Sequence, residues 1–216
     1  MREQLAAFLS ALRTSAADRF FPQPLDSVDA LGAFVGQRAA YVAQTALYGY
    51  LKTRMGTRFP EYFSNETFAA SIKAAAVRVF ASNAADLSIH ATALAAREGG
   101  LDDAATAALA RACFARALAC GVDPADAALL PTDARAAFAV RTAGTDWARA
   151  AEGSAAFAGS ADDLIRFAPV IDEFKKLDRE IVRNSVRFRW VNVRDQLSRR
   201  LVAEAVCADW RRRSGS

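Results

Sequence analysis

The only histidine, His90, follows Asp86 by four residues in the stretch ADLSIHATA, so the two side chains share one face of a helix. A base oriented by a carboxylate is half of a catalytic triad, and Ser88 or a cysteine could supply the nucleophile. Ser88, however, is two residues from His90 and points to a different face of a helix. The pattern therefore favours a structural hydrogen bond, and we predict no catalytic residue.

The sequence contains no motif for metal or nucleotide chemistry. With one histidine, no HExxH and scattered carboxylates, we expect no metal site. The absence of a Walker loop and of GxGxxG argues against a nucleotide enzyme, and we expect no cofactor. Pairs of carboxylates stand instead where helices are expected to begin, near the positive end of the helix dipole. These pairs are Asp102-Asp103, Asp162-Asp163 and Asp172-Glu173.

A more informative polar pattern lies on a helix that we predict from Asp26 or Ser27 to about Met55. Its polar and aromatic side chains recur at helical spacing on a stretch otherwise rich in Gly and Ala, and they need partners if they are buried. Two interpretations stay open: a structural network between two central helices, or a groove that binds a ligand or a partner. The residues assigned to this groove are Arg38, Tyr41, Gln44 and Tyr48, with Asn184, Arg187, Asn192 and Asp195 on the last helix.

The basic residues gather at the C-terminal end. The chain has a formal net charge of +4, with 28 Lys and Arg against 24 Asp and Glu, but residues 178–213 hold ten Arg and five acids. Arginines in a last helical turn complement the helix dipole. An acidic partner protein or a membrane surface would also attract them. We expect docking on such a surface through Arg199, Arg200, Arg211, Arg212 and Arg213, whereas nucleic-acid binding is less favoured because Lys is scarce.

The elements that position these residues are predicted to be helices throughout. Apolar residues make up 53% of the chain, which is enough for a sizeable core, and Ala is the best helix former. Apolar residues recur at helical spacing, with capping residues before the helices and Gly or Pro after them. We therefore predict an all-α fold, an irregular bundle of about six to eight helices around the long second, third and last helices.

The last helix shows this spacing best, although VRFRWVNVR (186–194) alone alternates like a strand. In the longer context, apolar residues fall at steps of three and four, and no stop signal appears between about residues 172 and 212. We predict one continuous helix there, with Trp190 buried against the second or third helix. The stripe consists of Val182, Val186, Trp190, Val193, Leu197, Leu201 and Ala205.

The domain organisation is predicted to be a single helical domain over residues 1–216. Region 122–170 is interrupted by Pro and Gly, and we assign it as a short-helix appendage or cap. We expect a first helix around residues 5–16, and a helix capped by Ser160. Three cysteines without CxxC spacing suit a reducing compartment. With no transmembrane span or signal peptide in the pattern, we expect a cytoplasmic protein, with the inner membrane face as an alternative docking place.

Two segments, RAAYVAQTALYGYLKTRMG (38–56) and VRNSVRFRWVNVRDQLSRRL (182–201), resemble a family of uncharacterised all-helical bacterial proteins, some of which carry the label esterase. The resemblance implies a helical fold but brings no established catalytic residue. The label lacks support here, because GxSxG is absent and the helical pattern leaves no room for a parallel sheet. The matching residues are Arg38, Tyr41, Gln44, Leu47, Tyr48, Tyr50 and Arg54, then Arg183, Asn184, Arg187, Asn192, Asp195 and Arg199.

These observations favour a non-enzymatic protein: an adaptor, assembly factor or regulator that binds a protein partner, at a membrane surface or away from it. The alternative is a small-molecule-binding protein or enzyme with a polar pocket between helices around Tyr41, Tyr48 and Arg187. A packed interior with an exposed apolar face would favour the first hypothesis. An enclosed pocket lined by these three residues would favour the second.

Overall fold

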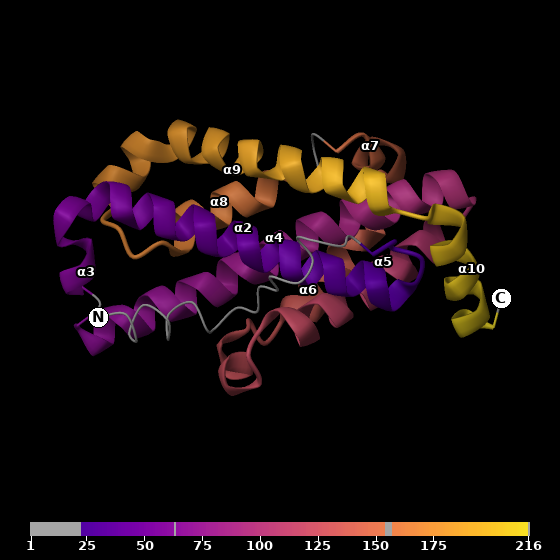
Figure 1. The fold of residues 1–216 in the computed structure, drawn as a ribbon, viewed down its shortest axis with the longest axis horizontal. Helices are drawn as coiled ribbons and strands as arrows, with labels where there is room; N and C mark the ends of the chain where they lie inside the picture. Colours follow the sequence, from indigo (N-terminus) through magenta and orange to yellow (C-terminus); the bar gives the residue numbers. More distant parts are fainter. Residues whose placement is uncertain (1–22, 63, 154–156, 216) are drawn as a thin grey trace.

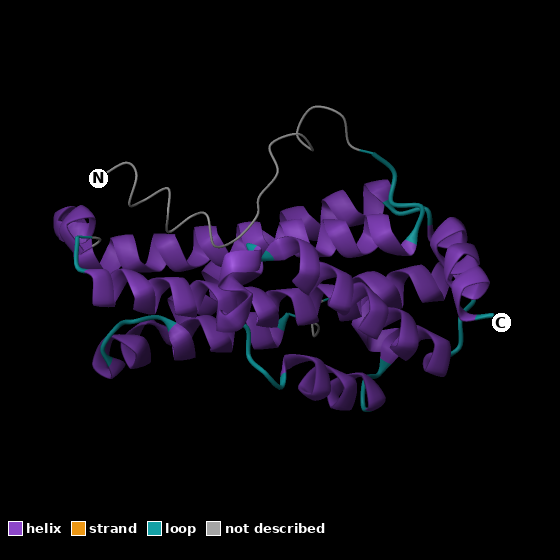
Figure 2. Cartoon of the chain, turned by 90° about the horizontal axis from the view of Figure 1, so that it is seen from below, coloured by secondary structure: helices purple, strands orange, loops and turns teal. Residues whose placement is uncertain are grey.

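The computed structural model describes residues 23–62, 64–153 and 157–215, and the predicted helix around residues 5–16 lies outside them. In these three stretches the chain forms nine α-helices, one of them only four residues long, and no strand, so the predicted all-α fold is confirmed (Figures 1 and 2). The α-helices are α2 (Val28–Met55), α3 (Phe59–Tyr62), α4 (Glu66–Gly99), α5 (Asp103–Gly121), α6 (Ala134–Ala143), α7 (Trp147–Glu152), α8 (Ala158–Phe167), α9 (Asp172–Arg200) and α10 (Ala203–Ser214). Two short 3-10 helices join them, η2 (Gly56–Arg58) and η3 (Pro124–Leu129).

Local sequence signals set several helix ends. The side chains of Ser27, Asn65 and Asp102 each accept a hydrogen bond from the backbone N–H three residues further on, at 3.3, 3.0 and 2.7 Å. Gly100 ends α4 with φ of 68°, a left-handed conformation that glycine adopts without strain. The predicted helix starts at Ser27 and at Asp102 are therefore confirmed.

Helix α4 is the central element of the bundle. Between Ile72 and Ala96 nearly every side chain is buried, on all sides of the helix. Such burial requires neighbours all round, and α2, α5, α7, α8 and α10 all pack against α4 (Figure 1). A helix this rich in alanine presents little bulk, so its neighbours approach closely. The core of the protein is built around α4.

Glycine brings α2 and α5 together. A Cβ atom on Gly36 would lie 2.6 Å from Cys120 Sγ and 2.8 Å from the Ala117 carbonyl oxygen, which is closer than van der Waals contact allows. Cys113 is buried in the same interface, and burial raises the pKa of its thiol to about 12. Both cysteines of α5 thus pack against neighbouring helices.

The prediction of one continuous helix from about residue 172 to 212 is wrong, because the chain breaks between α9 and α10. Leu201 and Val202 are non-helical although neither Gly nor Pro is nearby. The Leu25 N–H donates to the Arg200 carbonyl at 2.8 Å, and the Val202 N–H donates to the Leu25 carbonyl at 3.0 Å. Hydrogen bonds to a segment far away in the sequence thus replace those of a continuous helix, and they turn α10 across the end of the bundle (Figure 1).

Region 122–170, predicted as an appendage or cap, contributes side chains to the main core. Phe138, Trp147 and Leu164 are all buried in the same hydrophobic cluster as α2 and α4. The prediction that Ser160 caps a helix is wrong, since α8 begins at Ala158 and Ser160 lies inside it. The reason is tertiary, because the N–H and hydroxyl of Ser160 donate to the carboxylate of Asp86 on α4.

Candidate functional site

Asp86 and His90 are the residues whose types could most readily do chemistry. Both form hydrogen bonds that join helices. Asp86 is buried and accepts from the Ser160 N–H at 2.7 Å, from the Ser160 hydroxyl and from Arg141 Nη2 at 2.6 Å. Burial raises the pKa of Asp86, while Arg141 and Ser160 act in the opposite direction. The carboxylate therefore ties α6 and α8 to α4.

His90 points to a different partner. Its Nδ1 lies 2.9 Å from the carbonyl oxygen of Ala150 on α7, which makes Nδ1 the protonated nitrogen. The ring is buried beside Phe157. Burial lowers the pKa of His90, and the charges of Arg194 and Arg97 lower it further, against the effect of the Ala150 carbonyl. The neutral imidazole thus fastens α7 to α4, in line with the structural hydrogen bond expected for this residue.

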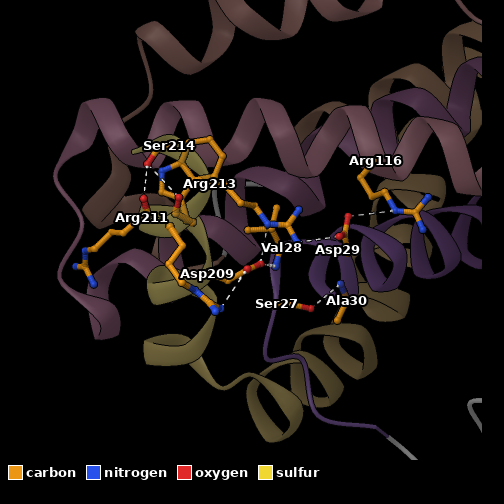
Figure 3. A network of polar contacts seen from close by, with 11 residues as sticks. Ser27, Val28, Asp29, Ala30, Arg116, Asp209, Arg211, Arg213 and Ser214 are labelled. Atoms are coloured by element: carbon orange, nitrogen blue, oxygen red, sulfur yellow. Dashed lines mark hydrogen bonds and ion pairs between the residues drawn. The ribbon is translucent and has the colours of Figure 1, made fainter. Parts of the chain in front are cut away.

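Two arginines of α10, Arg211 and Arg213, bind the body of the protein, and Figure 3 shows the contact of Arg213 with Asp29. Arg211 Nη2 donates to the Gly99 and Gly100 carbonyls at the C-terminus of α4, at 2.9 and 3.1 Å. Arg213 donates to Asp29 at 2.8 Å and pairs with Asp209 at 3.0 Å, and Asp209 accepts from the Val28 N–H. The Val28 hydrogen bond and the neighbouring arginines lower the pKa of Asp209.

The other arginines predicted for docking also have neighbours in the chain. Arg200 donates to the Gln23 carbonyl at 2.9 Å, and Arg199 pairs with Asp195 one turn earlier in α9. Arg212 extends into solvent, 3.4 Å from the Asp209 carboxylate at its nearest nitrogen. These contacts account structurally for most of the basic cluster, and docking of residues 199–213 on an acidic surface stays a prediction.

The side chains of the predicted polar groove are spread over α2 and α9. On α2, Gln44 is buried, Tyr41 is 43% exposed, and the Tyr48 ring packs edge-on against Phe59 at 4.8 Å. The Arg38 guanidinium lies 5.7 Å from the ring centre of Phe34.

On α9, the predicted groove residues lie on or near the solvent side. Asn184 and Arg187 are exposed. Asn192 accepts from Gln196 at 3.3 Å, and Asp195 pairs with Arg199. Contacts between α2 and α9 are made by other residues: Arg54 with Asp178, and Arg189 with the Thr45 carbonyl at 3.4 Å.

A pocket of about 360 Å³ does lie between α2 and α9, with α8 at its base, and it is half open to solvent. Its walls come from the C-terminal half of α2 and the N-terminal half of α9. The apolar part consists of Ala46, Gly49, Leu164, Ile181 and Val182, and the polar part of Tyr50, Thr53, Arg54, Asp178, Ser185 and Arg189. The position agrees with the predicted pocket between these helices, but the lining residues differ from Tyr41, Tyr48 and Arg187.

Several polar side chains that line this pocket form hydrogen bonds with one another. Two guanidinium nitrogens of Arg54 bind the buried carboxylate of Asp178, and Arg189 Nη1 donates to the carbonyl and hydroxyl oxygens of Ser185. Tyr50 is only 8% exposed, and its buried hydroxyl lies beside the Arg54 guanidinium. Burial raises the pKa of Tyr50 in spite of the nearby Arg54 charge.

A second feature of α9 is its exposed apolar side, which adjoins the pocket at Ile181. The buried side chains of this helix are Val182, Val186, Trp190, Val193 and Leu197. Five large apolar side chains lie outside this buried face and are 39 to 79% exposed: Phe174, whose ring centre lies 4.6 Å from the Arg54 guanidinium, Leu177, Ile181, Phe188 and Val191. We call these five residues the outer stripe. With Asn184 they follow each other at alternating steps of three and four, which is the heptad spacing of helices that pair with another helix.

Charged side chains flank the outer stripe in an ordered way. Glu173, Glu180, Arg187 and Arg194 follow at seven-residue intervals along one side, acidic in the first half of α9 and basic in the second. Glu180 and Arg187 are exposed, and neither forms an ion pair with another described residue. Arg194 donates to the Glu152 carbonyl at 2.9 Å, which leaves its charge uncompensated. Opposite charges thus occupy opposite halves of one helix edge.

No protein family, curated protein or solved structure matches this chain. The resemblance of residues 38–56 and 182–201 to uncharacterised helical proteins therefore stays a prediction. Among the described helices, none is long and apolar enough to cross a membrane. Within the same residues, no three side chains of the metal-binding types cluster together. The site must be interpreted from its own geometry.

The sequence analysis did not identify the outer stripe or the residues that line the pocket, for different reasons. The outer stripe has a signal, because Phe174, Leu177 and Ile181 begin a second series at steps of three and four beside the buried one. No local pattern in the sequence indicates the pocket. Tyr50 and Arg54 lie far from Asp178 and Arg189 in the sequence, and only the packing of α2 on α9 brings them together.

Proposed function

We propose that this chain is a non-enzymatic helical assembly protein of the cytoplasm, and that the outer stripe of α9 binds a second copy of the chain. The observation that supports this proposal is the exposure of five large apolar side chains in heptad register opposite the buried face. Apolar surface of this kind on one face of a helix is typical of sites that bind another protein. The commitment of Asp86 and His90 to hydrogen bonds between helices agrees with a non-enzymatic role.

The charges beside the outer stripe favour a second copy of the chain as the partner, with its α9 antiparallel to the first. In an antiparallel pair, the flank that holds Glu173, Glu180, Arg187 and Arg194 meets the same flank of the other copy in reverse order. Glu180 then faces Arg187 of the second copy, and Glu173 faces Arg194. By symmetry each pair occurs twice. A parallel pair would instead bring Arg194 towards Arg199, which places like charges together.

The apolar layers agree with the same register. When Glu180 faces Arg187, Leu177 meets Phe188 of the second copy and Phe174 meets Val191. Ile181 and Asn184 lie next to the twofold axis. A polar Asn within an apolar seam lowers affinity but selects one register and orientation, so the exposed Asn184 has a role in this arrangement.

The test is the oligomeric state of the full chain by analytical ultracentrifugation over a range of concentrations. We expect a monomer–dimer equilibrium that Leu177→Asp and Phe188→Asp each abolish, because a charge would be buried in the seam. Both side chains are exposed in the monomer, so the fold is retained, as circular dichroism would verify. Arg135→Glu, an exposed change on α6, is the control that leaves the equilibrium unchanged.

Orientation is tested by exchanging charges. Glu180→Arg and Arg187→Glu should each weaken the dimer, roughly threefold to tenfold, since each creates two like-charge contacts. The double variant restores opposite charges in an antiparallel pair and should recover wild-type affinity. A protein that stays monomeric at high concentration overturns the proposal. A dimer insensitive to both Asp variants excludes α9 as its interface, and a dimer in which the double variant gives no recovery excludes the antiparallel register.

A further inference from the structure

A second pocket, of about 370 Å³, lies between α4, α7 and α9 and is open to solvent on one side. Helix α4 contributes His90, Leu94 and Arg97 to its lining, and α9 contributes Val191 and Arg194. Val191 belongs to the outer stripe, and Arg194 belongs to the charged series that flanks it. The pocket therefore adjoins the surface that we assign to the second copy, so an inference about its occupant rests on that proposed function.

This pocket carries a surplus of positive charge. Among the described residues, the carboxylate beside Arg97 is that of Glu98, the next residue in the chain, at 3.5 Å and half exposed to solvent. Arg194 meets no carboxylate in the described part of the chain. The Asp195 carboxylate, which also lines the pocket, pairs with Arg199. Two arginines thus line one pocket, and a further carboxylate between them would bind both.

The end of α7 holds Arg194 in position. Its Nη2 donates to the Glu152 carbonyl at 2.9 Å, and its guanidinium lies against Gly153, where a Cβ would be 2.6 Å from Nε. The Nε atom is buried, so a partner can contact this guanidinium only at its terminal nitrogens. An arginine that is already held in one place loses less conformational entropy when it binds.

The N-terminal end of α9 in the second copy has the complementary chemistry. Glu173 is exposed and pairs with no basic side chain among the described residues, and Phe174 beside it is 39% exposed. In the antiparallel register, Glu173 of the second copy faces Arg194, and Phe174 of the second copy meets Val191. Because Arg194 and Val191 both line the pocket, this end of the second copy lies at its opening.

We propose that the pocket between α4, α7 and α9 receives the Glu173 carboxylate of a second copy, which binds between Arg97 and Arg194. Arg97 then belongs to the interface although it lies on α4, outside the outer stripe. Because the pair has twofold symmetry, each copy provides one carboxylate and receives one. The two contacts, at opposite ends of the paired helices, strengthen the preference for the antiparallel register.

The experiment is a double-mutant cycle, measured as the dimer dissociation constant of the full chain by analytical ultracentrifugation. We expect Arg97→Gln and Glu173→Gln each to weaken the dimer, roughly threefold to tenfold, because each removes an ion pair that occurs twice. In the Glu173→Gln background, Arg97→Gln should have no further effect, since the carboxylate that Arg97 binds is already absent.

A matched control separates this contact from a general effect of charge. The Arg97 side chain is more than half exposed in the monomer, so Arg97→Gln retains the fold, as circular dichroism would verify. The control is Arg149→Gln, which removes an exposed arginine of α7 that lines a different pocket. It changes the net charge by the same amount and should leave the dissociation constant unchanged.

The outcomes distinguish this contact from dimerisation itself. A wild type that stays monomeric at high concentration overturns both proposals. A dimer that Leu177→Asp abolishes but Arg97→Gln leaves unchanged retains the outer stripe as the interface and overturns the pocket contact. If Arg97→Gln weakens the Glu173→Gln dimer as much as the wild type, Glu173 is not the occupant. If calorimetry shows that the monomeric Leu177→Asp variant binds inorganic phosphate through Arg97 while the dimer does not need Arg97, the pocket binds a free anion instead.

Discussion

Two regions of this protein use apolar residues in opposite ways. In the region of α2, α4 and α5, small residues allow close contact between helices, and Gly36 lies against Ala117 and Cys120. In the layer formed by α9, large side chains predominate, a pocket of about 360 Å³ remains beside α2, and the outer stripe faces solvent. In the first region, the apolar side chains are buried against other residues of the same chain. The second retains apolar surface that only another molecule can bury, and it is the region to which we assign binding.

The largest expected loss of stability concerns Trp190, on the inner face of α9. It tests whether this face is packed as tightly as the central helices. Trp190 is 1% exposed and stacks on Phe157 at 4.6 Å, so its predicted burial is confirmed, with Phe157 as the ring beside it. We expect Trp190→Ala to lower the free energy of unfolding by about 3–5 kcal/mol. Urea denaturation followed by circular dichroism measures this. A loss below about 1 kcal/mol would mean that α9 is loosely attached.

The second prediction compares two glycines of one helix. Gly36→Ala should destabilise the protein by about 1–3 kcal/mol, because the added Cβ collides with Cys120 and the Ala117 backbone. Gly49→Ala, on the side of the pocket, should stabilise it by about 0.5–1 kcal/mol, because alanine favours the helix and nothing rigid is near. If urea denaturation gave the same change in unfolding free energy for both variants, the two sides of α2 would not differ in how closely their neighbours pack.

The third prediction concerns His90, at the contact of α4 with α7 near Arg194 of α9. Its pKa is lowered by burial in the folded state, so the unfolded chain binds a proton first as the pH falls below about 6.5. Stability should therefore decrease with falling pH between 6.5 and the lowered pKa, by at most about 1.4 kcal/mol per pH unit.

The control for the pH effect is His90→Asn, measured by urea denaturation at several pH values from 7.5 downwards. This variant should remove the His90 part of the slope. Asp86, whose pKa is raised, contributes with the opposite sign and is present in both proteins, so it cancels in the comparison. An identical slope in the two proteins would show that His90 is accessible to protons in the folded state.

The smallest expected effect is on the outer stripe. Leu177→Ala and Phe188→Ala should change the unfolding free energy by less than about 0.5 kcal/mol at concentrations where the chain is monomeric, because both side chains already face water. The same two variants should weaken the dimer. A large loss of monomer stability would mean that the stripe is covered within the chain itself.

Particular residues show how far the sequence can be interpreted alone. Ser27 and Asp102 cap helices as predicted, because a capping side chain bonds to a backbone N–H only three residues away. The buried stripe of α9 from Val182 to Leu197 is also confirmed, because side chains at helical spacing share a face in any context. The break after Arg200 could not be predicted, because the residue that makes it favourable is Leu25.

The sequence by itself determined the all-α class, several helix ends and the inner face of the last long helix, since these depend on interactions within a few residues. Tertiary structure decided the rest. It brought Tyr50 and Arg54 of α2 to Asp178 and Arg189 of α9, and it gave Asp86 its partners on α6 and α8. It also left the outer stripe exposed, because a periodic pattern shows which side chains share a face but not which face the rest of the chain will cover.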